Sequence, residues 1–204
     1  MFTGIVERIG TISSVETTTT GKKLVLKTSP WNSPPTHGES ISISGCCLTL
    51  ASHRAQGDDL LITFDIVPES LRRTTLGNIA QGTSLNVERA LRADSLLGGH
   101  QVQGHVDDVE QILALTDSGT GEQRLRCSLQ NIDVDTIVPQ GSITIDGVSL
   151  TIASVEEDYF EVALIPTTLK ETTLGMSKVG DYVNIETDII ARTVAHVLRN
   201  MQKK

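Results

Sequence analysis

The chain has 204 residues, of which 38% are hydrophobic and only 3% aromatic, and its formal net charge is −8. This length allows one domain or two small ones, and cores with so few aromatic side chains must rely on Val, Ile and Leu, which favour strands. An acidic chain without a basic block lacks the features of a surface that binds phosphate backbones or stacks bases, so nucleic acid is not an expected partner.

The cysteines and the hydropathy pattern indicate where the protein resides. Side chains of adjacent residues diverge in a strand, so no bridge is expected between Cys46 and Cys47, and the odd third cysteine, Cys127, indicates a reducing compartment. The first residues lack the basic and apolar regions of a signal peptide, and no apolar run approaches the length of a membrane span. We therefore expect a cytoplasmic protein without a membrane partner, and the absence of a CxxC motif predicts no metal site.

The first half of the chain predicts short strands separated by turn signals. Strands are expected over residues 4–16, 24–26, 41–50, 60–67 and 84–89, with a turn at 17–21 and a proline-rich loop at 30–38. The strand at 41–50 is interrupted by Gly45, which marks a bulge or the close approach of another backbone. A short helix is expected over residues 69–76, with Gly77 closing it.

The second half of the chain repeats this order. Strands are expected over 104–115, 124–130, 142–153, 159–165 and 182–187, with a helix over 167–174. The duplication is visible in the residues, because Thr74-Thr75-Leu76-Gly77 recurs as Thr172-Thr173-Leu174-Gly175. It predicts an all-β protein of two tandem six-stranded antiparallel Greek-key barrels, with one unit at residues 1–97 and the other at residues 98–188.

Residues 189–204 lie outside both repeats. Ile190, Val194, Val197 and Met201 follow one another at spacings of four, three and four, which is the seam of an amphipathic helix. This C-terminal α-helix either packs on its own barrels or joins subunits. Oligomerisation is the favoured interpretation, because a seam of this length needs partners to be stable.

The most informative stretch is Gly45-Cys46-Cys47-Leu48-Thr49, which recurs as Gly147-Val148-Ser149-Leu150-Thr151. In a strand, one face of each copy is apolar and the other is small and polar, with Cys47 in the first copy and Ser149 in the second. A barrel core explains the apolar face but not a polar outer face in both copies. A lone cysteine is ordinarily a buried, unreactive thiol, but the repeat favours two similar pockets, of which one carries a thiol.

Two other features bear polar groups. His100 and His105 stand among glycines, which permit close backbone approach to a flat ligand, and their five-residue spacing places the imidazoles on opposite faces of a strand, where they would not share a metal. General acid–base work near neutral pH is a reasonable role for either histidine. The segments 65–70 and 164–168 each end a strand and open a helix, where free N–H groups and hydroxyls can bind a polyol or a uracil-like edge, or simply cap the helix.

A family resemblance is carried by the hexapeptide Met1-Phe2-Thr3-Gly4-Ile5-Val6, the two Gly-x-x-Leu-Thr segments, Gly98-Gly99-His100 with Gly104-His105, and both Thr-Thr-Leu-Gly segments. Through these motifs the chain closely resembles riboflavin synthase over essentially its whole length. The resemblance implies a transferase that dismutates two molecules of 6,7-dimethyl-8-ribityllumazine. Transfer of a four-carbon unit would give riboflavin and 5-amino-6-ribitylamino-uracil, the last step of riboflavin biosynthesis, without a metal or another cofactor.

The resemblance also implies how the chain assembles. Its two units would be lumazine-binding barrels, and residues 189–204 would hold a homotrimer together. Each active site would then lie between the N-terminal barrel of one subunit and the C-terminal barrel of another. Lumazine synthase is a further expected associate.

The site residues follow from the same resemblance. We expect Cys47, His105 and Ser149 nearest the chemistry, with Thr151 orienting the ligand and Cys47 acting either as a nucleophile or as pocket lining. The N-terminal site would comprise Phe2, Thr3, Gly4, Ile5, Val6, Cys47, Leu48, Thr49, Asp65, Ile66, Val67, Pro68, Glu69 and Ser70. The C-terminal site would comprise Gly104, His105, Val106, Asp146, Ser149, Leu150, Thr151, Ile165, Pro166, Thr167, Thr168, Leu169 and Lys170, with Asp188 as a supporting group. Gln140 stands where many family members have Lys, so a contact from a cationic side chain to the ligand is either lost or replaced by an amide.

Three other functions compete with this interpretation. A non-catalytic lumazine-binding antenna protein would tend to keep the binding motif of one barrel and lose the other, whereas both copies are intact here and Cys47 is present. A flavin-binding barrel of an oxidoreductase would need a nucleotide-binding partner domain, and the sequence has no glycine-rich phosphate loop. A purely structural duplicated barrel gives no reason for the matched polar outer faces.

Overall fold

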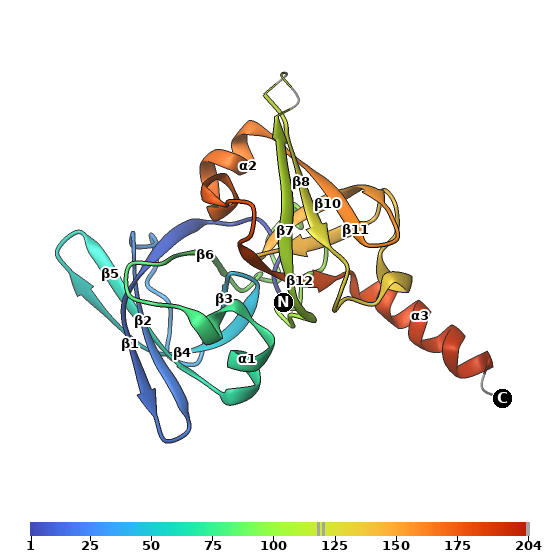
Figure 1. Ribbon diagram of the computed structural model, residues 1–204. Helices are drawn as coiled ribbons and strands as arrows, with labels where there is room; N and C mark the ends of the chain where they lie inside the picture. Colours follow the sequence, from blue (N-terminus) through green and yellow to red (C-terminus); the bar gives the residue numbers. More distant parts are fainter. Residues whose placement is uncertain (118, 120, 203–204) are drawn as a thin grey trace.

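The computed structural model describes residues 1–117, 119 and 121–202. In these residues the chain forms two closed six-stranded antiparallel barrels in tandem, followed by a C-terminal helix (Figure 1). This architecture confirms the predicted fold class. Positions 118 and 120, and Lys203 and Lys204 at the end of the predicted helix, lie outside the described residues.

The N-terminal barrel has the strand order β1-β2-β5-β4-β3-β6. Its strands are β1 (Arg8–Thr18), β2 (Gly21–Thr28), β3 (Ser40–Ile43), β4 (Cys46–Gln56), β5 (Asp59–Ile66) and β6 (Ser84–Arg89). The chain leaves β2 and enters β3 three positions further round the barrel, with β5 and β4 between them, which is a Greek-key connection. Helix α1 (Pro68–Arg73) and the 3₁₀ helix η1 (Thr75–Asn78) connect β5 to β6.

The C-terminal barrel repeats this strand order, since β7-β8-β11-β10-β9-β12 is the same closed sequence of neighbours. Its strands are β7 (Asp108–Asp117), β8 (Gln123–Ser128), β9 (Ser142–Ile145), β10 (Val148–Val155), β11 (Tyr159–Leu164) and β12 (Tyr182–Thr187). The connections contain the short helices η2 (Val134–Thr136), α2 (Pro166–Glu171) and η3 (Thr173–Met176).

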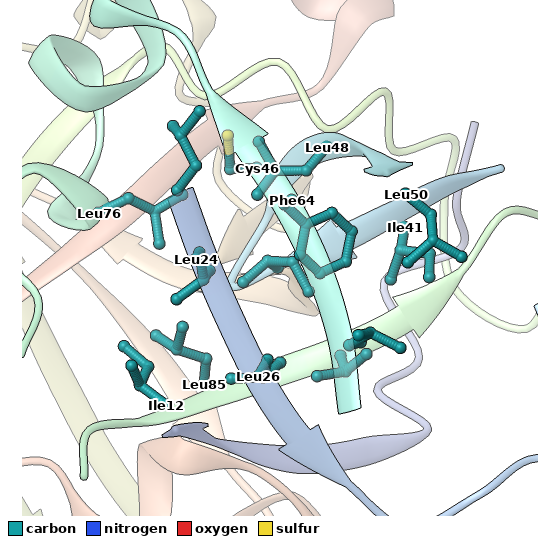
Figure 2. Close-up of a cluster of buried hydrophobic side chains, with 14 of the residues drawn as sticks. Ile12, Leu24, Leu26, Ile41, Cys46, Leu48, Leu50, Phe64, Leu76 and Leu85 are labelled. Atoms are coloured by element: carbon teal, nitrogen blue, oxygen red, sulfur yellow. The ribbon is translucent and has the colours of Figure 1, made fainter. Parts of the chain in front are cut away.

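Alternating burial along β4 separates the core of the N-terminal barrel from its outer face. In β4 the side chains of Cys46, Leu48 and Leu50 are buried, whereas Cys47 is half-buried and Thr49 is exposed. Figure 2 shows the buried side chains meeting around the ring of Phe64 inside the N-terminal barrel. The predicted apolar and polar faces of this strand are therefore confirmed.

The turn between β3 and β4 corrects one prediction. Residues 41–50 form two strands, because Ser44 (φ of 43°) and Gly45 (φ of 83°) make a tight turn that folds β4 back on β3. Left-handed φ values at both central residues are typical of the two-residue turns that suit twisted hairpins. Asp146 and Gly147 make the equivalent turn in the other barrel. A Cβ on Gly45 would lie 2.8 Å from the backbone nitrogen of Gly147, so the expected close backbone approach does occur.

The predicted helices at 69–76 and 167–174 are each divided in two. Helix α1 ends at Arg73, and the extended residue Thr74 accepts a hydrogen bond from the Leu76 N–H to start η1. Gly77 therefore lies within η1 and does not close the α-helix. A glycine is needed there because a Cβ would lie 2.3 Å from the Leu71 carbonyl oxygen.

Helix α3 (Ile189–Gln202) forms where the seam predicted a helix. Arg199 pairs with Asp133 and Asp135, which fastens the helix to η2. Figure 1 shows α3 extending away from the barrels, with the C-terminus at its far end. In the described part of the chain, no helix has the length and apolar character required to cross a membrane.

Candidate functional site

Each barrel is completed by a short segment that precedes the other barrel in the chain. Residues 2–6 pack on the C-terminal barrel and residues 102–106 pack on the N-terminal barrel, and we call them the exchanged segments. The Ser149 N–H on β10 donates to the Gly4 carbonyl oxygen, and the Cys47 N–H on β4 donates to the Gly104 carbonyl oxygen, both at 2.8 Å. Val106 accordingly packs in the N-terminal core, and Val6 packs against the C-terminal core. The exchange gives two equivalent arrangements, one around Cys47 and one around Ser149.

This exchange corrects the predicted grouping of site residues. The sequence placed residues 4–6 with Cys47 and residues 104–106 with Ser149, but the structure pairs them the other way. A repeat aligns equivalent positions along the chain. It does not show whether a leading segment folds on its own barrel or on the neighbouring one.

The two exchanged segments also pair with each other. The Phe2 N–H donates to the Val102 carbonyl at 2.7 Å, and the Val102 N–H donates back at 3.1 Å. Phe2 has no exposed surface, and a Cβ on Gly104 would lie 2.9 Å from its ring and 2.6 Å from the Cys47 Cβ. Phe2, predicted to cover a ligand ring, thus supports the segment exchange in this structure.

Two buried carboxylates that the sequence analysis did not select hold these segments. Glu88 at the end of β6 accepts from the Thr3 N–H, the Thr3 hydroxyl and the Gly4 N–H at 2.7, 2.8 and 3.0 Å. Glu186 at the end of β12 accepts from three consecutive N–H groups, at residues 103–105. Burial raises the pKa of both carboxyls. The recurrence of Asn-x-Glu at the end of each unit was the signal that could have found them.

The asparagines of the same Asn-x-Glu motifs join the barrels. Asn86 donates to the Asp146 carbonyl at 2.9 Å and accepts from the Thr173 N–H at 2.8 Å. Asn184 makes the mirrored contacts with the Ser44 carbonyl, at 2.7 Å, and with the Thr75 N–H. These buried contacts fix the two hairpin turns against each other, so the two arrangements are held rigidly within one chain.

On the C-terminal barrel, His100 is the histidine next to Ser149. Its Nδ1 lies 2.7 Å from the Ser149 hydroxyl, and its Nε2 lies 3.2 Å from the Thr144 hydroxyl. Burial lowers the pKa of His100, so the neutral ring prevails near pH 7 and can accept a proton. A Cβ on Gly99 would lie 2.8 Å from the Ser149 Oγ, which explains the glycine beside this histidine.

On the N-terminal barrel, a recess of about 350 Å³ opens beside Cys47. Its walls include Glu69 and Ser70 from α1 and His105 from the exchanged segment. The volume lies at the lower end of the range for small-molecule pockets. Both cysteines line the recess, but Cys46 is buried and Cys47 is half-buried. Burial raises the pKa of Cys46 to about 12, so that thiol stays neutral.

The remaining predicted residues divide by exposure. Leu48, Leu150 and Ile66 are buried in the cores and could meet a ligand only through their backbones. The exposed members flank the outer faces of the barrels: Ile5, Thr49, Asp65, Val67, Pro68, Thr151, Ile165, Pro166, Thr167 and Lys170, with Thr168 and Leu169 half-buried. Gln140 is exposed in the turn before β9. Asp188 accepts from the Ile190 N–H at 2.8 Å at the start of α3.

Acidic, histidine and cysteine side chains are the protein ligands of most metal sites. Among residues 1–117, 119 and 121–202, no three of them gather closely enough to hold a metal ion.

Comparisons with known proteins agree with the duplicated architecture. The model of the lumazine binding domain matches residues 3–90 and 103–188. Riboflavin synthase of Mycobacterium tuberculosis is 39% identical over 203 residues, which cover 98% of this chain and 99% of that protein. Riboflavin synthase of Bacillus subtilis is 36% identical, over 94% of this chain and 87% of that protein.

Solved structures show the same fold. The crystal structure of LumP complexed with riboflavin has a TM-score of 0.77 and 23% identity, and covers 92% of this chain and 100% of that one. LumP complexed with 6,7-dimethyl-8-(1'-D-ribityl) lumazine has a TM-score of 0.74 and 22% identity, over 92% and 99% of the two chains. With two matched lumazine binding domains and relatives that align over nearly their full length, the chain belongs to the riboflavin synthase family.

Proposed function

We propose that the chain catalyses the riboflavin synthase reaction, in which two molecules of 6,7-dimethyl-8-ribityllumazine give riboflavin and 5-amino-6-ribitylamino-uracil. The observation that carries the proposal is the matched pair of arrangements around Cys47 and Ser149, each completed by an exchanged segment. A reaction between two copies of one substrate needs two binding surfaces of one design. The duplicated barrel supplies them in a single chain.

The differences between the two arrangements suit the two roles in the reaction. One lumazine must lose a proton from an activated methyl group, and the other must accept a nucleophile. Ser149 has the neutral imidazole of His100 at 2.7 Å as a proton acceptor, while Cys47 and His105 share a recess. General acid–base groups contribute about 10²- to 10⁴-fold to a rate, and stacking two bound substrates removes the cost of their encounter.

We also propose that the active site forms between subunits of a cytoplasmic homotrimer. The outer stripe of α3 is exposed in the single chain, with Ile190 65% and Met201 68% accessible. Burial of such a stripe against neighbouring copies is the ordinary way to stabilise it. Contact between the N-terminal barrel of one subunit and the C-terminal barrel of the next would bring a Cys47 recess to face Ser149. Lumazine synthase, which would supply the substrate, is the proposed associate.

Incubation of the purified chain with 6,7-dimethyl-8-ribityllumazine alone tests the reaction. Riboflavin should appear by absorbance, with one molecule formed for every two lumazines consumed. Tight binding without turnover would contradict the proposal and favour an antenna-type ligand carrier. If the chain neither binds nor converts the lumazine, the interpretation as a purely structural duplicated barrel would be favoured.

Deletion of residues 189–204 tests the shared site. The truncated chain should sediment as a monomer and lose most of its turnover. A fully active monomer would contradict an active site between subunits.

A further inference from the structure

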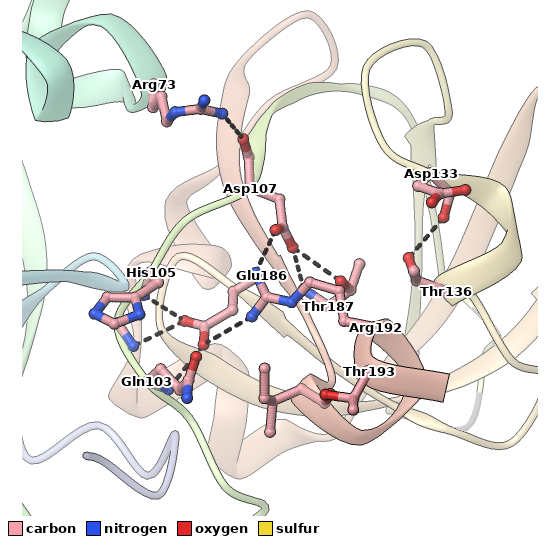
Figure 3. Close-up of polar contacts among 12 residues, drawn as sticks. Arg73, Gln103, His105, Asp107, Asp133, Thr136, Glu186, Thr187, Arg192 and Thr193 are labelled. Atoms are coloured by element: carbon pink, nitrogen blue, oxygen red, sulfur yellow. Dashed lines mark hydrogen bonds and ion pairs between the residues drawn. The ribbon is translucent and has the colours of Figure 1, made fainter. Parts of the chain in front are cut away.

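We propose that Arg192 of α3 is a positioning residue that holds the segment bearing His105 in place through Asp107 and Glu186. This inference rests on the proposed function and deepens it, because it gives the C-terminal helix a role in the site of the N-terminal barrel. Figure 3 shows the contacts that connect α3 to His105.

Glu186 is the centre of this cluster. Its side chain is 3% exposed and accepts from the N–H groups of Gln103, Gly104 and His105 at 2.8, 2.9 and 3.1 Å. These three donors lie on the backbone that also gives its Gly104 carbonyl to the Cys47 N–H. The Glu186 carboxylate therefore holds the backbone of residues 103–105, which in turn hydrogen-bonds to Cys47 beside the recess.

Arg192 places its guanidinium between two carboxylates. Nη1 lies 2.5 Å from Asp107 Oδ1, and Nη2 lies 3.9 Å from Glu186 Oε1. The second oxygen of Asp107 accepts from the N–H and the hydroxyl of Thr187, at 2.8 and 2.9 Å. Among the described residues, Nε and Nη2 of Arg192 are buried without a hydrogen-bond partner. Arg192 therefore hydrogen-bonds to half-buried Asp107 through Nη1 and acts on buried Glu186 through its charge.

The N-terminal barrel provides the contrast. Glu88 binds residues 3 and 4 in the same way, but the charged group that acts on it is Glu7, which raises its pKa further. Glu88 forms no ion pair with the part of the chain that the structure describes, so its segment is held by hydrogen bonds alone. In the C-terminal barrel the cation comes from α3, and Arg192 itself lines the recess with Cys47 and His105. Loss of the Arg192 contacts, unlike loss of the Arg199 anchor, would consequently change the position of the His105 segment.

The charges around Glu186 predict a pH signature. Burial is the main effect on its pKa and raises it, Arg192 on α3 lowers it, and Asp107 before β7 raises it. The other ionisable groups at the recess are Cys46 and Cys47 on β4, Glu69 and Arg73 on α1, and His105. Without Arg192 the pKa of Glu186 rises further, so the ionised form that accepts three N–H bonds is lost at a higher pH on acidification.

Three full-length variants test the inference in the lumazine assay. Arg192→Met should lower kcat about tenfold with KM within about threefold of the parent, and it should move the acid limb of the kcat/KM profile to higher pH. Arg192→Lys keeps the cation, so its kcat and the acid limb of its kcat/KM profile should lie close to those of the parent. Arg199→Met is the matched control, because it removes the other ionic anchor of α3, to Asp133 and Asp135. It should leave kcat within about twofold and the pH profile unchanged.

Thermal unfolding and sedimentation of each variant separate positioning from general loss of structure. Parent-like kcat and pH profile in Arg192→Met would overturn the inference, and so would equal losses in Arg192→Met and Arg199→Met. Should Arg192→Met not assemble, Asp107→Asn alters the same anchor without changing α3. Because the charge of Asp107 raises the pKa of Glu186, its removal should move the acid limb to lower pH, opposite to Arg192→Met, and an unshifted limb would overturn the inference. An inactive parent would instead contradict the proposed function, so the two failures are distinguishable.

Discussion

Cys47 in the N-terminal barrel and Ser149 in the C-terminal barrel occupy the same position of a duplicated fold, yet their surroundings differ. Both donate a backbone N–H to a glycine carbonyl of the exchanged segment, at the same distance of 2.8 Å. Ser149 additionally contacts His100, whereas Cys47 faces a recess with His105. The duplication has kept the backbone contacts and varied the side chains, which is how two identical substrates can receive different roles.

The largest effect is expected from the bridge between the exchanged segments. Phe2→Ala should lower the free energy of unfolding by about 3 to 5 kcal/mol, because it removes a fully buried ring and leaves a cavity. Val102→Ala, on the opposite strand of the same bridge, should cost about 2 kcal/mol. Urea unfolding measures both. Equal and small losses would mean that the segments are not needed to hold the barrels together.

The two polar outer faces should differ in their effect on turnover. Ser149→Ala should lower kcat by about 10²-fold, because the His100 imidazole loses the hydroxyl that it contacts. Cys47→Ala, at the equivalent position, should lower kcat by less than about tenfold if the thiol lines the recess. Stopped assays of riboflavin formation compare the kcat of the two variants, and a binding measurement checks that each variant still takes up the ligand. A larger loss for Cys47→Ala would assign the nucleophile to the thiol and reverse the comparison.

Periodicity and repetition were sufficient to predict the barrels, because alternating burial is a local property of each strand. The positions of Cys47, Leu48 and Thr49 relative to the core follow directly from it. The hairpin at Ser44 was not predicted, since a left-handed serine gives no clear signal before a glycine whose role could equally be a bulge.

The sequence did not predict which of the candidate site residues lie together. His105 and Cys47 do meet, although the sequence placed them in different barrels. Which segment lies on which barrel depends on contacts between residues about 100 positions apart, such as that of Ser149 with Gly4, and no local pattern encodes these. Glu88 and Glu186 were missed because a buried carboxylate that binds backbone N–H groups looks like any charged strand end.

The hairpin turns should differ in pH dependence. Burial raises the pKa of Asp146 from about 3.8 to about 7, whereas Ser44 takes the same place in the N-terminal barrel. Between these pH values the folded protein binds a proton that the unfolded chain does not, so stability falls as pH rises. The parent should lose about 2 kcal/mol more than Asp146→Ser between pH 4 and 8, a partial value because the side chain is half-buried.

Urea unfolding across this pH range, with Ser44→Ala as the control, measures the difference. Asp146→Ser keeps an oxygen that can accept from the Asn184 N–H, as Ser44 accepts from the Asn86 N–H. Parallel stability curves for the parent and Asp146→Ser would show that Asp146 does not titrate in this range.

The smallest effect is expected in the loops that follow β2 and β8, which the two barrels anchor by different means. In the C-terminal barrel, buried Glu110 accepts from three consecutive N–H groups, at residues 130–132. In the N-terminal barrel, the centre of the partly exposed Trp31 ring lies 4.6 Å from Cζ of Arg8 and 5.6 Å from Cζ of Arg89. The indole N–H of Trp31 donates to the Glu7 carboxylate. Cation–π contacts at exposed sites are each worth about 0.5 to 1 kcal/mol, so this anchor should be the weaker one.

Trp31→Leu should therefore lower the free energy of unfolding by only about 1 kcal/mol, while making the 29–39 loop more accessible to limited proteolysis. Arg126→Gln is the control, because it removes a cation–π contact, 4.0 Å from the Tyr159 ring, that joins two strands of the other barrel. It should leave the 29–39 loop protected. An unchanged cleavage rate in Trp31→Leu would show that the ion pair of Arg89 with Glu39 already anchors this loop, and the contrast between an aromatic and a carboxylate anchor would then disappear.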